Sequence, residues 1–82
     1  MITIKRYSNR KLYDTRENHY TNLNGVAQII RQDDEDLQVV SKNDERDLTT
    51  QILAQIISEE EKKSPRVGIE TLTKIIRTGI IE

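Results

Sequence analysis

The 82-residue sequence contains no cysteine, tryptophan or phenylalanine, one proline, one histidine and three glycines. Without cysteine, the chain can form neither a disulfide nor a thiolate metal site. No apolar run approaches the roughly 18 residues of a membrane span, and residues 1–16 lack the apolar stretch of a signal peptide. A short chain with one histidine offers little for a closed active site, so we predict no enzyme, no metal and no cofactor. We expect a cytoplasmic protein without membrane contact.

The apolar residues that are present are aliphatic: 12 Ile, 6 Leu and 4 Val, beside three Tyr. Hydrophobic residues make up 34% of the chain and charged residues 33%, which predicts a small core. A domain of this size buries only about 60% of the surface that its unfolded chain exposes. Contact with a second copy would enlarge the core, and we therefore expect a homo-oligomer, either a dimer or a tetramer.

The net charge of −1 hides an uneven distribution. Residues 1–16 hold five bases and one acid, a net charge of +4. Residues 17–82 hold eight bases and thirteen acids, a net charge of −5. A basic arm on an acidic body indicates an anionic partner for the arm, which the overall charge alone would not suggest.

The basic arm has the pattern of a β-hairpin. Apolar and polar residues alternate from Ile2 to Tyr7, which places Ile2 and Ile4 on one face of a strand. Ser8-Asn9 is a candidate two-residue turn because Asn tolerates positive φ, and Arg10–Asp14 is a second strand. With this turn, Tyr7 would face Arg10, and Arg6 would face Lys11.

The rest of the chain predicts alternating short strands and amphipathic helices. We therefore expect a small single α+β domain with an N-terminal β-hairpin, further short strands and two to three helices. After the hairpin, the expected elements are a strand at His19–Thr21, a helix capped by Asn22 that ends at Arg31, a strand at Leu37–Val40, a helix from an N-cap at Thr49 to about Lys62, and a helix over Ile69–Ile81.

The segment from Lys5 to Thr15 interleaves bases with aromatic, amide and hydroxyl side chains. Lys and Arg neutralise phosphates, Arg can read guanine, and Asn can read adenine. A two-stranded ribbon fits the major groove, and Asn9 and Arg10 at its turn are the best candidates for base contact. The alternative is a solvated hairpin whose charges face water.

Three further features have candidate roles and simpler structural interpretations. The acidic run Asp33–Asp36 lacks the alternating ligand spacing of a calcium loop, and we interpret it as a solvated loop. His19 has no second histidine beside it in the sequence, so we interpret it as structural. Tyr13 and Tyr20 are expected to pack on the core, and Tyr7 could either pack or stack on a base.

The run Lys5-Arg6-Tyr7-Ser8-Asn9-Arg10-Lys11-Leu12-Tyr13-Asp14-Thr15 resembles the opening motif of the polyhydroxyalkanoate synthesis repressors, in their N-terminal DNA-binding domain. Ser8 stands where that family usually has proline. The resemblance covers about residues 4–61. It continues through Tyr20, Leu23, Ala27, Ile30-Arg31 and Val39-Val40, and closes with Asp47-Leu48-Thr49 and Gln55-Ile56-Ile57-x-Glu59.

The resemblance implies a bacterial transcription regulator that represses genes of polymer storage and binds double-stranded DNA through residues 1–62. A polymer granule or a granule-coat protein would be a further partner. Residues 63–82 lie beyond the resemblance, and we interpret them as a linker and an amphipathic oligomerisation helix. The alternatives are that this helix packs on the core or binds a partner or the polymer. The alternative is an assembly module whose basic arm binds a protein, a granule or an anionic nucleotide. The candidate DNA contacts are Lys5, Arg6, Tyr7, Ser8, Asn9, Arg10, Lys11, Thr15 and Arg16, and the candidate oligomer contacts are Ile69, Leu72, Ile75, Ile76 and Ile80.

Overall fold

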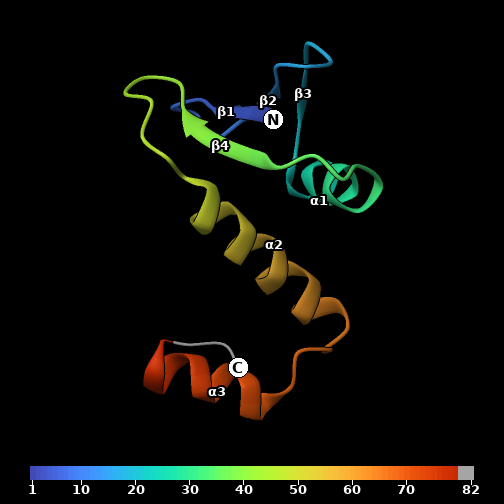
Figure 1. The fold of residues 1–82 in the computed structure, drawn as a ribbon, viewed down its shortest axis with the longest axis vertical. Coiled ribbons are helices and arrows are strands. Elements are labelled where there is room, and N and C mark those ends of the chain that lie inside the picture. Colours follow the sequence, from blue (N-terminus) through green and yellow to red (C-terminus); the bar gives the residue numbers. More distant parts are fainter. Residues whose placement is uncertain (80–82) are drawn as a thin grey trace.

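The computed structural model describes residues 1–79 and consists of one four-stranded sheet and three helices (Figure 1). The strand order is β3-β2-β1-β4, in which β1 pairs antiparallel with β2 and parallel with β4, and β2 pairs antiparallel with β3. The α+β class predicted from the sequence is confirmed. In chain order the elements are β1 (Ile2–Arg6), β2 (Leu12–Asp14), β3 (His19–Thr21), α1 (Leu23–Gln32), β4 (Leu37–Ser41), α2 (Thr49–Lys63) and α3 (Ile69–Thr78).

Strand alternation divides the sheet into two faces with different surroundings. The inner face carries the aliphatic core, which α1 and α2 cover. No helix of residues 1–79 covers the outer face (Figure 1). The buried core residues are Ile2, Ile4, Leu12, Val26, Ala27, Val39, Leu48, Ile52 and Ile56.

The hairpin is confirmed, but its turn has three residues, Ser8–Arg10. Arg6 pairs with Leu12, the Tyr7 N–H donates to the Lys11 carbonyl at 2.9 Å, and Arg10 has φ 66°. A three-residue hairpin loop commonly ends in a left-handed residue, and that residue is Arg10. The expected pairing of Arg6 with Lys11 is therefore wrong, since it required a two-residue turn with positive φ at Asn9.

Helix α1 begins as its sequence predicts, because the Asn22 Oδ1 accepts from the Gly25 N–H at 2.8 Å. A Cβ at Gly25 would lie 2.0 Å from the Thr21 Oγ1. Glycine lowers helix propensity here, but it allows the first turn of α1 to approach the end of β3.

Helix α2 begins at Thr49 by a different arrangement from the predicted one. Thr49 is the first helical residue, and its Oγ1 accepts from the Val39 N–H at 2.9 Å instead of capping the helix. The Asp47 Oδ1 accepts from the Thr49 N–H at 2.9 Å, and the Leu48 N–H donates to the Val39 carbonyl at 2.7 Å. This Asp47-Leu48-Thr49 segment therefore pairs with the outer edge of β4 and connects it to α2.

Helix α3 lies apart from the sheet, beyond the C-terminal end of α2 (Figure 1). None of its residues is buried, and the side chains of Ile69 and Ile76 are 83% and 84% exposed. The predicted helix ran to Ile81, but Ile80 and Ile81 lie outside the described residues. No helix within residues 1–79 is both long and apolar enough to cross a membrane.

Candidate nucleic-acid interface

The β1–β2 turn and the loop after β4 lie at the same end of the sheet (Figure 1). The parallel pairing of β1 with β4 places Arg6 beside Ser41, and the Lys42 N–H donates to the Arg6 carbonyl at 2.9 Å. Residues about 35 positions apart in the sequence therefore meet here. The result is a basic end of the sheet, to which both the hairpin and the loop contribute lysine and arginine side chains.

Three arginines of this end, Arg6, Arg10 and Arg46, form what we call the arginine cluster. All three line a groove of about 270 Å³, together with Asp44. Among the described residues, none of the three makes an ion pair. The groove therefore has more cations than anions, and its guanidinium groups are available to an external anion.

A second groove of about 550 Å³ lies on the inner side of the hairpin. Arg6 and Arg10 line this groove too, together with Lys11, which precedes β2, and Gln55 from α2. These two arginines thus contribute to both grooves beside the turn.

The one acid of the arginine groove, Asp44, is held in its loop. The backbone N–H of Arg46 donates to the Asp44 Oδ1 at 3.2 Å. This bond, followed by a hydrogen bond from Ser41, lowers the pKa of the Asp44 carboxyl. Asp44 is therefore charged at neutral pH, and it partly offsets the arginines.

The predicted DNA contacts separate into three groups. The first consists of Arg6, Ser8 and Arg10, which line one or both grooves, and of Asn9, which lies between Ser8 and Arg10 in the turn. The second consists of Lys5, Tyr7 and Lys11, which alternation places on the outer face of the sheet. The third, Thr15 and Arg16, lies at the opposite end of β2.

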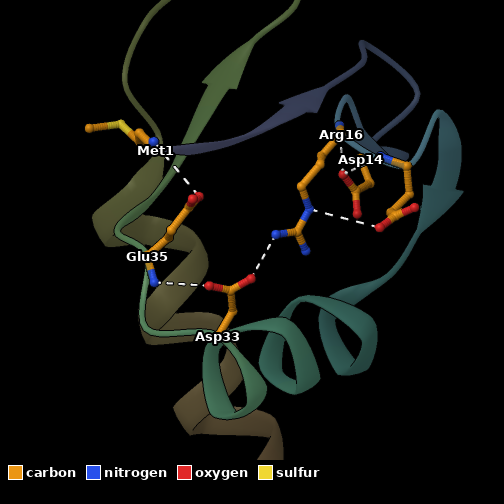
Figure 2. A network of polar contacts seen from close by, with 6 residues as sticks. Met1, Asp14, Arg16, Asp33 and Glu35 are labelled. Carbon is orange, nitrogen blue, oxygen red and sulfur yellow. Dashed lines mark hydrogen bonds and ion pairs between the residues drawn. The ribbon is translucent and has the colours of Figure 1, made fainter.

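The third group is engaged within the protein. The Thr15 Oγ1 donates to the Thr3 carbonyl at 2.7 Å. The Arg16 Nη1 lies 2.7 Å from the Asp33 Oδ2, and Figure 2 shows this ion pair between the turn after β2 and the end of α1. The hydrogen bond to Asp33 raises the pKa of Arg16. These two side chains are thus tied to the body of the domain.

Asp14 orders the turn that leads to Arg16. Its side chain is only 1% exposed, and its Oδ1 accepts from the backbone N–H groups of Arg16 at 2.9 Å and Glu17 at 3.2 Å. Asp14 therefore caps the turn that follows β2.

The tyrosines do not pack on the aliphatic core, so the expectation for Tyr13 and Tyr20 is wrong. Leu12 and Asp14 face inward, and alternation turns Tyr13 and its pairing partner Tyr20 outward. With Tyr7 they form a cluster on the outer face, with ring centroids 5.2–6.2 Å apart.

The acidic run and His19 have structural contacts. Asp33 pairs with Arg16, and its Oδ1 accepts from the Glu35 N–H. The bond from Glu35 is the largest of the effects that lower the pKa of Asp33, followed by the hydrogen bond from Arg16. Glu35 lies 3.8 Å from the N-terminal amine. The His19 ring contacts the Tyr20 carbonyl at 3.1 Å.

Sequence reasoning missed Lys42 and Arg46 as parts of the basic end. Their signal in the sequence was weak, because two bases flanking the Asn43-Asp44 turn are ordinary in a surface loop. Only the pairing of β1 with β4 brings them next to Arg6 and Arg10.

Comparisons with known proteins agree with the resemblance carried by the basic arm. The family of the PHB/PHA accumulation regulator DNA-binding domain matches residues 3–64. No solved structure matches the chain.

Two relatives are bacterial proteins of unassigned function. One, from Thiocystis violacea, is described as an uncharacterized protein in the phbA 5′ region; it is 40% identical over 75 residues, which cover 90% of this chain and 54% of the relative. The other, an uncharacterized protein from Allochromatium vinosum, is 36% identical over 75 residues, 90% of this chain and 48% of the relative. The chain thus spans about half the length of these relatives. On the match over residues 3–64, the chain belongs to the family of PHB/PHA accumulation regulator DNA-binding domains.

Proposed function

We propose that this domain binds double-stranded DNA through the hairpin turn and the arginine cluster, as the DNA-binding part of a repressor. The observation that carries the proposal is the position of Arg10. It occupies the exposed turn, lines both flanking grooves and, among the described residues, makes no ion pair.

Duplex DNA fits this end by shape and charge. The major groove is about 12 Å wide and admits a two-stranded ribbon. The turn can therefore enter the groove while basic side chains on either side of the turn neutralise phosphates. Arg10 at the tip can bond guanine in a bidentate manner. Arg6 and Arg46, beside the turn, would contact phosphates.

Two predicted contacts have smaller roles in this proposal. The Asn9 Oδ1 accepts from the Lys11 N–H at 3.1 Å, which engages the oxygen that bidentate adenine recognition needs. Arg16 is paired with Asp33 at the other end of β2. We therefore assign base contact to Arg10 and give Arg16 a structural role.

The test is binding of a fluorescent DNA duplex by anisotropy at low salt. The double variant Arg10→Gln with Arg46→Gln should lose at least tenfold in affinity, because it removes two unpaired cations. Arg66→Gln with Arg77→Gln is the matched control, since it removes the same charge from exposed arginines outside the cluster. Equal affinities of the two double variants would refute the proposed surface.

The same titration addresses the alternative of a module that binds other anions. If the alternative is correct, a nucleotide or an acidic protein should displace the duplex from the arginine cluster, and the domain should show no preference for duplex DNA over these anions. The family supports DNA as the partner, and the position of the Thiocystis violacea relative near phbA supports a target among polymer-storage genes. A binding site in DNA upstream of such genes would appear as a footprint.

We also propose that α3 mediates association of two copies. Ile69, Leu72 and Ile76 follow helical spacing along one exposed stripe, and residues 1–79 provide no partner that buries it. Ile75 is partly buried, and Ile80 lies outside the described residues. Two-fold association would present two hairpins to a repeated half-site.

Sedimentation tests this association. The chain should sediment as a species larger than its 9.6 kDa monomer, and Ile76→Lys should restore the monomer. Lys74→Ile replaces a charged side chain with an apolar one at a neighbouring exposed position and should leave the dimer intact. A wild-type monomer at high concentration would contradict the proposal.

A further inference from the structure

The outer face of the sheet carries all three tyrosines of the chain, and no helix of residues 1–79 covers it (Figure 1). Tyr13 and Tyr20 are direct cross-strand partners on β2 and β3, and Tyr7 follows β1. The rings of Tyr13 and Tyr20 meet edge to face at 82°, with centroids 5.2 Å apart. We call this surface the tyrosine face.

The rings stabilise one another and remain accessible. Tyr7 and Tyr13 are partly buried, whereas Tyr20, on the edge strand, is 55% exposed. An exposed aromatic group that neighbouring rings hold in place loses little freedom when a flat ligand stacks on it.

The tyrosine face is also basic. Lys11 Nζ lies 5.5 Å from the centroid of the Tyr20 ring, and Lys42 Nζ lies 5.8 Å from that of Tyr7. Lys5 lies on the same face of β1, beside Tyr13 of β2 and Val40 of β4. The outward positions of the four strands carry no acid, and Asp47, which pairs with Val40, adds one at the β4 edge of this face. None of the three lysines is in an ion pair among the described residues.

We propose that the tyrosine face binds a strand of unpaired nucleotides, either single-stranded DNA or RNA. Bases of such a strand stack on aromatic rings while lysines contact its phosphates. An open four-stranded sheet with exposed aromatic rings is one architecture that performs this function. This activity goes beyond the proposed duplex binding, because paired bases are stacked inside the helix and cannot reach the rings.

Charge complementarity distinguishes this ligand from a second copy of the chain. Two copies joined through this face would bring the lysine-rich surface of one protomer, with Lys5, Lys11 and Lys42, against the same surface of the other. An anionic strand with planar bases satisfies both the lysines and the rings.

The experiment measures binding of four ligands of about 12 nucleotides each: a thymidine strand, a uridine strand, an abasic deoxyribose-phosphate strand and a duplex. Tyrosine fluorescence is the first readout, because the chain has no tryptophan and all its tyrosines lie on this face. The base-bearing strands should quench it, and their affinity should exceed that of the abasic strand by about tenfold or more. Tighter binding of the thymidine strand would identify single-stranded DNA as the preferred ligand, and tighter binding of the uridine strand would identify RNA.

Variants separate stacking from charge. Tyr20→Ala should weaken strand binding about tenfold, and Tyr20→Phe should restore it, because stacking on one ring contributes a factor of this order. His19→Ala is the matched control on the same edge strand, since His19 alternates to the other face. If Tyr20→Ala fails to fold, the wild-type comparison of the thymidine and abasic strands still decides.

Equal binding of the thymidine and abasic strands would overturn the proposal, as would equally tight binding of polyglutamate. Absence of strand binding at low salt would overturn it as well. Duplex binding and the Arg10 and Arg46 variants report on the arginine cluster alone. The two proposals can therefore fail independently of each other.

Discussion

The Arg10 N–H donates to the Tyr7 carbonyl at 2.9 Å and closes the hairpin with Arg10 in the left-handed region at φ 66°. This conformation favours glycine, because a Cβ crowds the backbone there. The turn therefore places an arginine where glycine would be less strained. Strain of this kind gathers at functional sites, which agrees with a role for the Arg10 side chain in binding.

Arg10→Gly separates stability from function. Relief of the strain should leave the free energy of unfolding unchanged or raise it by up to about 1 kcal/mol, as measured by urea denaturation. Duplex affinity should fall nonetheless, because the guanidinium group is lost. A variant that binds duplex DNA as tightly as the wild type would show that the strained arginine has no role in binding.

Gly25→Ala should destabilise the domain, although alanine is the better helix former. Its Cβ would lie 2.0 Å from the Thr21 Oγ1, so the Thr21 side chain, β3 or α1 must shift, at a cost of about 1–3 kcal/mol in urea denaturation. The double variant Thr21→Ala with Gly25→Ala removes the clash and should recover most of this loss. A stabilised single variant would mean that the Thr21 side chain moves aside freely.

Asp14→Ala should cost about 2 kcal/mol or more in thermal or urea denaturation. It leaves the partly buried backbone N–H groups of Arg16 and Glu17 without their shared acceptor. Asp14→Asn keeps an acceptor oxygen and should cost less. Equal losses in the two variants would indicate that the charge, not the turn, stabilises the native state.

Acidification should weaken the contact network of Figure 2. Hydrogen bonds from the Glu35 N–H and from Arg16 depress the pKa of Asp33 in the folded state. Its contribution to stability is therefore present above the unfolded pKa of about 4 and is lost as the pH falls through the folded value. Urea midpoints should decline below about pH 4, and Asp33→Asn should flatten part of that decline. If the urea midpoint of Asp33→Asn fell below pH 4 as steeply as that of the wild type, this account would be contradicted.

Local sequence patterns predicted most elements of the fold. Alternation placed Ile2 and Ile4 inside, and the amide of Asn22 located the start of α1, because both signals depend on neighbouring residues only. The turn was misjudged by one residue, since the sequence does not reveal that Arg10, and not Asn9, has positive φ.

The candidate site was less predictable, because it depends on pairing between distant strands. Nothing near Lys42 or Arg46 indicates that the loop after β4 lies beside the hairpin. The tyrosine face required the register of β2 against β3, which turns Tyr13 and Tyr20 away from the core. The involvement of Arg16 with Asp33 also follows only from the tertiary structure.

Salt dependence of duplex binding tests the central claim most directly. Anisotropy titrations over a range of salt concentrations should give a log–log slope of about −0.9 for each phosphate neutralised. The double variant Arg10→Gln with Arg46→Gln should make this slope shallower by about one to two, and Arg66→Gln with Arg77→Gln should leave it unchanged. Absence of duplex binding at low salt, or the same slope in both double variants, would contradict DNA binding through the arginine cluster.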